Sequence, residues 1–263
     1  GAHRYVNLLQ EVDISVCAHV AAWTILRYYG NKYHNYADTT MGAIVQNIKG
    51  DMGRKTPSNG LTPVQIADLF QNYGFSPIIR GGMKEVNNQF LDEMIAYIES
   101  GIPIVGFISP KQHAVSIVGH GTIHYDLLRD PVSLYKLKDE KTGIILHSKL
   151  IYSLYVMEDN YFGYRKVPKD LPTISSDVDY NLFEIKFAVI PLYEKMQLVY
   201  NEVYERYVSL VESETMNWED VKVTRIYMTS ANSLKRETES NEQMCQELKT
   251  IILRLNMPKF VWC

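Results

Sequence analysis

The sequence predicts an α+β protein in which an N-terminal helical part packs on an antiparallel β-sheet. Segments with helical periodicity dominate up to residue 99, short apolar runs separated by turns follow, and helical periodicity returns near residue 194. The chain has 263 residues, 46% of them hydrophobic, enough for one large core. We expect a main domain over residues 1–190 and an αβα annex over residues 191–263, which can belong to the same domain.

The charge and cysteine content exclude several classes of protein. The net charge is -3 without a long basic run, which argues against nucleic acids and anionic membranes as partners. No apolar run approaches the roughly 18 residues that span a bilayer. Cys17, Cys245 and Cys263 are too far apart for a disulfide framework or a C-x-x-C metal site, and the segment holding His120 and His124 is not helical. We therefore predict no metal and no cofactor.

The first predicted helix runs from Cys17 to Tyr29. It is apolar nearly all round, so we expect it to be buried, and Gly30 is expected to end it at the C′ position. The polar stretch 31–60 then predicts a surface excursion around a short helix, Met41–Ile48.

Two further helices are expected before the sheet begins. Thr62 is the predicted N-cap and Pro63 the first residue of a helix that runs to Tyr73 and ends at Gly74. Another helix is predicted over Glu85–Glu99, with its apolar side chains on one face.

Two apolar runs joined by a short polar turn predict a β-hairpin. The strands are Ile104–Ile108 and His113–Gly119, and the turn is 109–112. Further strands are expected at 144–147, 151–158 and 183–190, with a loop at 168–181. The annex is predicted to contain a helix at Glu194–Val211, a strand at Val221–Met228 and a last helix at Asn241–Leu255.

Cys17 is the first candidate for chemistry, because it stands at the start of a helix. Backbone N–H groups and the positive end of the helix dipole favour a thiolate there. A lone cysteine among apolar neighbours is more often a core residue. His113 favours a catalytic Cys17 over a core cysteine, since it begins a strand after a polar turn and supplies the base that a nucleophilic thiol needs.

A third group is needed to orient the imidazole through its other nitrogen. Asp159 follows a hydrophobic strand and is favoured over Asp130, which precedes Pro131 and is typical of a turn. Asn160 is the alternative if the register differs by one residue. Gln10, upstream of Cys17, is expected to help the Cys17 N–H stabilise the oxyanion of an acyl-transfer intermediate.

The order Gln10, Cys17, His113, Asp159 resembles that of papain-like cysteine peptidases, above all the bacteriocin-processing (double-glycine leader) peptidases and their bacterial relatives. Four segments carry the likeness: Gln10–Gly30, 60–75, 101–105 followed by 113–120, and 157–164. The resemblance implies a papain-like fold and a thiol nucleophile that acts on an amide, and therefore a peptide or protein substrate.

We therefore predict a cysteine peptidase that works through a thioester acyl-enzyme. The alternatives are acyl transfer or deamidation on the same fold, or a module that binds peptides without cutting them. The chain begins Gly-Ala-His, as a tag remnant or an excised domain would. Localisation, cytoplasmic or secreted, and oligomeric state are left open.

Overall fold

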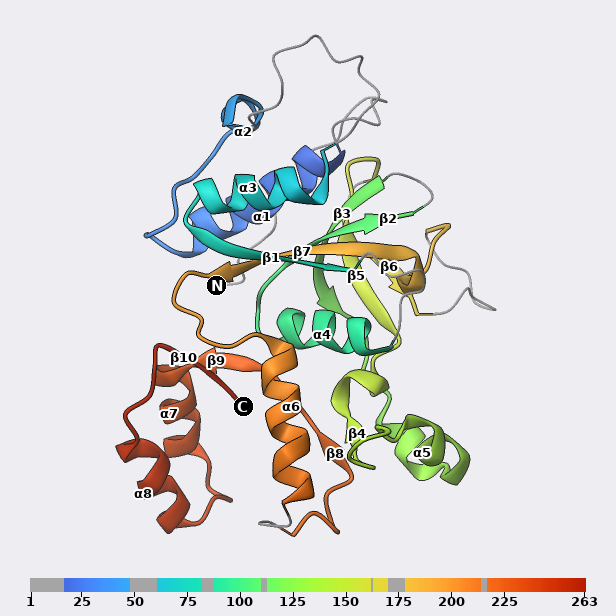
Figure 1. Cartoon of the computed structure of the whole chain (residues 1–263), viewed down its shortest axis with the longest axis vertical. Coiled ribbons are helices and arrows are strands. Elements are labelled where there is room, and N and C mark those ends of the chain that lie inside the picture. Colours follow the sequence, from blue (N-terminus) through green and yellow to red (C-terminus); the bar gives the residue numbers. More distant parts are fainter. Residues whose placement is uncertain are drawn as a thin grey trace.

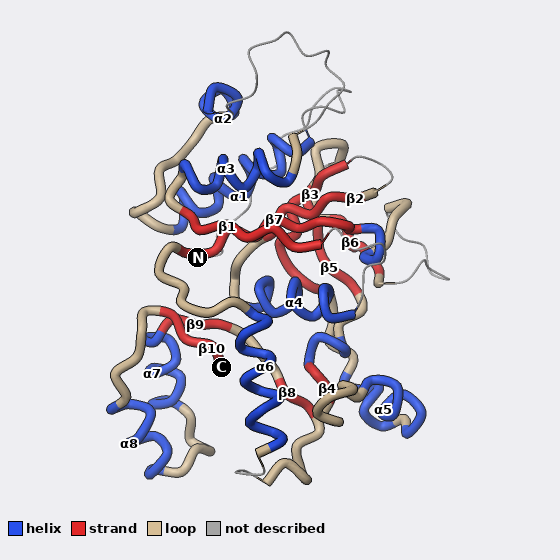
Figure 2. The backbone as a smooth tube through the Cα atoms, viewed as in Figure 1, coloured by secondary structure: helices blue, strands red, loops and turns tan. Residues whose placement is uncertain are grey.

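A six-stranded sheet lies at the centre of the protein in this computed structural model (Figures 1 and 2). The structure describes residues 17–47, 61–81, 88–109, 113–161, 163–169, 178–213 and 217–263. Each pairing in the sheet is antiparallel, and the strand order is β1-β7-β2-β3-β5-β6, which confirms the α+β class. The strands are β1 (Phe75–Gly81), β2 (Ile104–Ile108), β3 (His113–His120), β5 (Ser153–Met157), β6 (Arg165–Pro168) and β7 (Ile185–Tyr193).

The predicted hairpin is confirmed and forms the middle of the sheet. β2 pairs with β3 from Ile104 opposite Ile117 to Ile108 opposite His113. Consecutive residues of both strands are buried, such as Ile104 with Val105 and Ala114 with Val115, because helices cover the sheet on both faces. His113 therefore stands at the end of the hairpin, where the strands leave the core.

Helices lie on opposite faces of this sheet, as Figure 1 shows for α1 and α4. On one face, the Ser116 hydroxyl of β3 donates a hydrogen bond to the Ala21 carbonyl of α1, 2.9 Å away. On the other, Arg80 of β1 pairs with Glu93 of α4 at 2.8 Å. The strand register places Ser116 on the same face as Ile79, and Arg80, the next residue, points to the opposite face. The helices are α1 (Cys17–Lys32), α3 (Pro63–Asn72) and α4 (Asn88–Glu99).

The sequence predicts that helix α1 ends at Gly30. In the structure the helix continues to Lys32. Gly30 is needed for close packing. A Cβ at this position would lie 3.0 Å from the Asp38 Cα and 3.2 Å from the Ala37 carbonyl oxygen. The glycine thus lets the chain after α1 cross directly over the helix.

Helix α3 begins at Pro63 as predicted and ends at Asn72, one residue before the predicted end, with Tyr73 as its C-cap. Thr62 and Gln65 form a capping box, in which the Thr62 hydroxyl accepts from the Gln65 N–H and the Gln65 side chain accepts from the Thr62 N–H. Gly74 follows with a φ of 85°, a conformation that favours glycine. The short helix α2 (Met41–Asn47) is also confirmed, and α4 is confirmed over the part of 85–99 that the structure describes.

Two strands of the sheet were missed by the sequence analysis. β1 carries Pro77, which an edge strand tolerates because one row of its N–H groups has no partner strand. β6 is short and largely polar. Neither has the apolar run that marked the other strands. The remaining elements of the middle of the chain are β4 (Ile145–Leu146), α5 (Pro131–Leu137) and the 3-10 helices η1 (Tyr125–Arg129), η2 (His147–Leu150) and η3 (Leu182–Glu184).

The C-terminal helices begin and end elsewhere than predicted. β7 continues to Tyr193, opposite Phe75, so α6 begins only at Tyr200. The last helix, predicted over Asn241–Leu255, begins only at Gln246, because the Asn241 side chain accepts hydrogen bonds from two backbone N–H groups and forms a turn. The helix α7 before this turn was not predicted. The single strand predicted at Val221–Met228 is two short strands. The elements are α6 (Tyr200–Glu212), β8 (Val223–Thr224), β9 (Met228–Ser230), α7 (Ala231–Ser240), α8 (Gln246–Arg254) and β10 (Phe260–Trp262).

These C-terminal elements are attached to the helix α4 side of the sheet (Figure 1). The Tyr97 hydroxyl of α4 accepts a hydrogen bond from the Tyr200 N–H, and the Ser100 hydroxyl accepts one from the Met228 N–H. β7 spans the expected boundary at residue 190, and the division into two domains stays a prediction. None of the helices in the described ranges combines the length and apolar character needed to cross a membrane.

Candidate active site

Cys17 is the first residue of α1, as the sequence predicted. Its side chain is only 4% exposed. The helix start directs backbone N–H groups and the positive end of the dipole toward the sulfur. No acidic side chain lies in the first turn of α1 to oppose a thiolate.

His113 is the first residue of β3 and contacts Cys17. Its ring hydrogen-bonds the Cys17 thiol and, through Nε2, the Glu158 carboxylate at 3.1 Å. Burial alone would lower the pKa of His113, but these hydrogen bonds and the nearby negative charges outweigh it and raise the pKa to about 10. The site therefore favours the imidazolium form of His113.

Glu158 is the residue that the sequence analysis missed. It follows β5 directly, is 5% exposed, and places Oε2 on the imidazole of His113. The sequence predicts that Asp159 orients the His113 ring. The register explains the difference, because Ser116 is opposite Met157 in the β3–β5 pair. Continued by one residue, it puts Glu158 on the same face as His113 and Asp159 on the other.

Asp159 still contributes its charge to the site. Its side chain is also 5% exposed, and the carboxylate adds to the electrostatic stabilisation of the His113 imidazolium. Burial raises the pKa of Asp159, the charge of Glu158 adds to the rise, and His113 and two backbone N–H groups oppose it. Asn160, the other alternative, is exposed, and its N–H is one of those that bind Asp159.

Two of the expected positions lie elsewhere or outside the described residues. Asp130 is exposed and caps α5, where its carboxylate accepts from the Ser133 N–H at 2.9 Å and from the Ser133 hydroxyl at 2.6 Å. These hydrogen bonds lower the pKa of Asp130 and tie the side chain to the helix rather than to His113. Gln10, the predicted oxyanion donor, lies outside the described residues.

Arg165 of β6 lies behind Glu158. Its Nε is 4.0 Å from Glu158 Oε1, the oxygen not engaged by His113, and its guanidinium stacks on the Tyr161 ring at 3.9 Å. Tyr161 and Tyr164 are exposed beside it. In the parts of the chain that the structure describes, no group of three or more His, Cys, Asp or Glu side chains could hold a metal ion.

In this α+β fold a cysteine at a helix start contacts a histidine at a strand start, which is the arrangement of a thiol nucleophile and its base. The sequence match is more specific, since a family model described as the Peptidase_C39 like family matches residues 3–144, more than half of the chain. The chain belongs to this family. Cys17 and His113 lie inside the match and Glu158 outside it. A comparison with curated proteins gives no match.

Proposed function

We propose that the protein hydrolyses amide bonds of a peptide or protein through a thioester acyl-enzyme, on a papain-like fold. The observation that carries the proposal is the contact chain from the Cys17 thiol to the His113 ring to the buried Glu158 carboxylate. A buried carboxylate that fixes one imidazole nitrogen leaves the other for the thiol, which is the arrangement that nucleophilic catalysis requires. Membership of the Peptidase_C39 like family supports the same activity.

Acylation begins from the Cys17 thiolate and the His113 imidazolium. The sulfur attacks the carbonyl carbon, and the carbonyl electron pair moves to oxygen. The Cys17 N–H stabilises this oxyanion, together with Gln10 as the sequence predicts. The intermediate then collapses, the carbon–nitrogen bond breaks, and His113 gives its proton to the leaving amine. The product of this step is a thioester on Cys17 and a neutral imidazole.

Deacylation reverses the role of His113. The neutral imidazole takes a proton from water, and the oxygen of that water attacks the thioester carbon. The carbon–sulfur bond breaks, the carboxylic acid product leaves, and the thiolate and imidazolium are restored. Glu158 holds the ring orientation in both steps, and its charge together with that of Asp159 stabilises the imidazolium.

Selective alkylation tests this proposal, because the chain contains two internal control thiols. Cys245 and Cys263 are free and exposed, whereas Cys17 is buried. At about pH 6 an ordinary thiol is almost entirely protonated and reacts slowly with iodoacetamide. We expect peptide mass spectrometry to show faster labelling of Cys17 than of Cys245, by at least about tenfold, despite its burial.

His113→Ala is the matched variant, with circular dichroism to show that it is folded. It should reduce Cys17 labelling to a rate at or below that of Cys245. Slow labelling of Cys17 in the unmodified protein, unchanged by His113→Ala, would mean an inert core thiol and would refute the proposed activity.

A further inference from the structure

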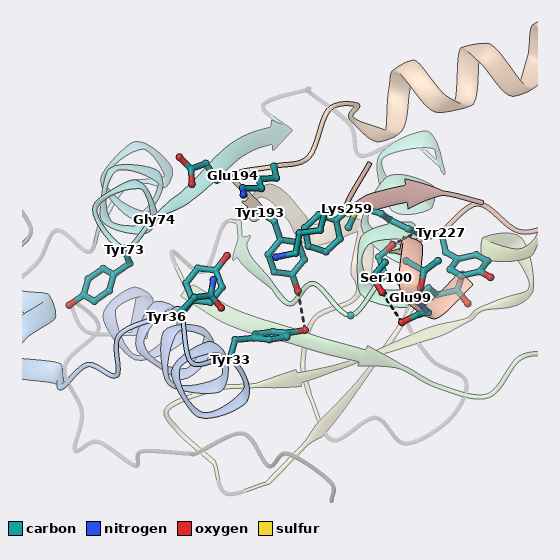
Figure 3. A pocket seen from close by; sticks show the side chains of 18 of the residues that line it. Tyr33, Tyr36, Tyr73, Gly74, Glu99, Ser100, Tyr193, Glu194, Tyr227 and Lys259 are labelled. Carbon is teal, nitrogen blue, oxygen red and sulfur yellow. Dashed lines mark hydrogen bonds between the residues drawn. The ribbon is translucent and has the colours of Figure 1, made fainter. Parts of the chain in front are cut away.

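A cavity of about 680 Å³ lies at the opposite end of α1 from Cys17 (Figure 3). Tyr33 and Tyr36, which line it, follow the last residue of the helix. A helix of 16 residues is about 24 Å long, so the cavity is remote from Cys17 and His113. Its volume is in the range of sites that bind small molecules.

The walls of this cavity come from two parts of the chain. One part lies inside the segment that matches the peptidase family and includes Tyr33, Tyr36 and Ser100. The other lies beyond residue 144 and includes Tyr193 and Lys259. The cavity therefore depends on the C-terminal elements of this particular chain and is not a property of the family segment alone.

The aromatic walls are held in place by stacking. The Tyr193 ring lies parallel to the Phe260 ring with centroids 4.6 Å apart, and the Tyr36 ring lies parallel to Phe75 at 4.4 Å. Because the rings are packed against neighbours on one side, little ordering is needed when a ligand contacts the other side. The hydroxyls of Tyr33 and Tyr193, both on the cavity wall, point toward one another and lie 3.4 Å apart (Figure 3).

Tyr36 and Tyr193 offer neutral hydroxyl groups as hydrogen-bond donors. Burial raises the pKa of Tyr36 to about 12, with the charges of Tyr33 and Glu194 adding to the effect. Burial also raises the pKa of Tyr193. The hydroxyls of Tyr36 and Tyr193 thus keep their protons at neutral pH and suit a ligand that presents acceptor oxygens.

The charges on the cavity walls leave an excess of cations. The five ionisable groups other than tyrosine are Glu99, Glu194, Lys195, Arg225 and Lys259. Glu99 is already neutralised, because the Arg225 Nε lies 3.1 Å from its Oε1. Glu194 is then the single remaining carboxylate beside two lysines.

Lys259 is the cation best placed to meet a ligand. Its Nζ lies over the Phe260 ring, 5.4 Å from the centroid, beside the stacked wall. Within the described ranges, neither Lys259 nor Lys195 forms an ion pair with a carboxylate. An ammonium group next to an aromatic wall and phenol donors matches a ligand that has an anionic group on a planar apolar body.

We propose that this cavity binds a small aromatic anion, with the rings of Tyr36, Tyr193 and Phe260 around its apolar body and Lys259 on its anionic group. Binding would not depend on Cys17 or His113.

Fluorescence titration with anilinonaphthalene sulfonate, an aromatic sulfonate, tests the site on the full chain. N-phenylnaphthylamine has the same ring system without the sulfonate and serves as the neutral probe. We expect saturable binding of one sulfonate per chain, and Lys259→Gln should weaken it about tenfold. The same substitution should leave the neutral probe unaffected. Tyr33→Phe, which removes one donor, should weaken the sulfonate alone.

Lys136→Gln is the matched control, because Lys136 is an exposed lysine on α5 outside the cavity. It should bind the sulfonate like the unmodified protein, as should Cys17→Ala. Three results would each overturn the proposal: no saturable binding, equal weakening by Lys259→Gln and Lys136→Gln, or no difference between the two probes in their response to Lys259→Gln. Since alkylation of Cys17 is measured separately, this outcome is independent of the proposed peptidase activity.

Discussion

Two adjacent carboxylates, Glu158 and Asp159, are buried next to His113 and act on it differently. Glu158 accepts a hydrogen bond from Nε2, whereas Asp159 stabilises the imidazolium by its charge. Burying two carboxylates side by side is unfavourable unless a positive charge compensates for them. The His113 imidazolium and the Arg165 guanidinium supply that compensation, so the protonation of His113 is tied to both acids.

Exchanging Glu158 for Gln tests which carboxylate orients the ring. The amide keeps the size of the side chain but removes the charge at Nε2, so the imidazolium becomes less stable. We expect alkylation of Cys17 to slow by at least about tenfold, the factor that corresponds to one pKa unit in His113. Asp159→Asn is the matched comparison and should slow the reaction less. The reverse ranking would assign the orienting role to Asp159.

The raised pKa of His113 can be measured directly by NMR of side-chain nitrogens in protein labelled at histidine. A histidine at its ordinary pKa of 6.5 is neutral at pH values where His113, at about 10, still carries its proton. We therefore expect the imidazolium signal of His113 to persist above about pH 8. Cys17→Ala removes a hydrogen bond that raises this pKa, so the signal should titrate at lower pH. Titration of all histidines near 6.5 would contradict the assigned contacts.

Cys17 and His113 could be selected from the sequence because each stands at the first residue of an element whose pattern is strong. The orienting carboxylate could not be selected in this way. Asp159 and Glu158 are neighbours, and only the strand register determines which one shares a face with His113. Asp130 could be assigned only from the structure, since its role as a helix cap requires the helix α5 that follows it.

At the scale of elements, predictions succeeded where local sequence determines the structure. The α3 capping box and the hairpin of β2 and β3 are local features, and both were confirmed. Predictions failed where distant contacts decide. β1 is a strand because it pairs with β7. Gly30 lies inside α1, where the absence of a side chain leaves room for the chain near Asp38. Non-local pairing of this kind has no signature in a short stretch of sequence.

Two glycines in helices, one in close contact with the backbone and one not, test whether Gly30 is needed for close packing. In α2, a Cβ at Gly42 would meet no atom within 4 Å, whereas at Gly30 it would lie 3.0 Å from the Asp38 Cα. Gly42→Ala should therefore stabilise the protein by about 0.4–1 kcal/mol. Gly30→Ala should destabilise it by about 1–3 kcal/mol, because backbone atoms must move. Urea unfolding midpoints measure both, and stabilisation by Gly30→Ala would show that the close contact is easily relieved.

At the scale of the whole molecule, the C-terminal elements share aromatic packing with the helix α4 side of the sheet. The Trp262 ring of β10 meets the Tyr97 ring of α4 edge to face, with centroids 5.6 Å apart. Its indole N–H donates to the Leu198 carbonyl at 3.0 Å. Tyr97 also binds the start of α6 through the Tyr200 N–H. One buried tyrosine of the main part thus contacts two separate C-terminal elements.

Trp262→Ala tests whether residues 191–263 unfold separately from the rest. The substitution removes the ring contact and the hydrogen bond. It should lower the free energy of unfolding by about 2–4 kcal/mol, less than the same substitution of a fully buried tryptophan. If the protein is one cooperative unit, the circular dichroism transition and the loss of the fast Cys17 alkylation expected of the folded protein will shift together to lower urea concentration. This is the result we expect, because β7 and the Tyr97 contacts join the two parts.

Trp262→Phe is the control, since it keeps an aromatic ring and loses only the N–H donor, so its shift should be about 1 kcal/mol. A separate domain would behave differently. Trp262→Ala would then split the circular dichroism transition in two and leave the urea dependence of Cys17 alkylation unchanged, because Cys17 reports on the main part alone. Since Cys17 on α1 and Tyr97 on α4 lie on opposite faces of the sheet, a common shift can arise only through cooperative unfolding of the whole chain.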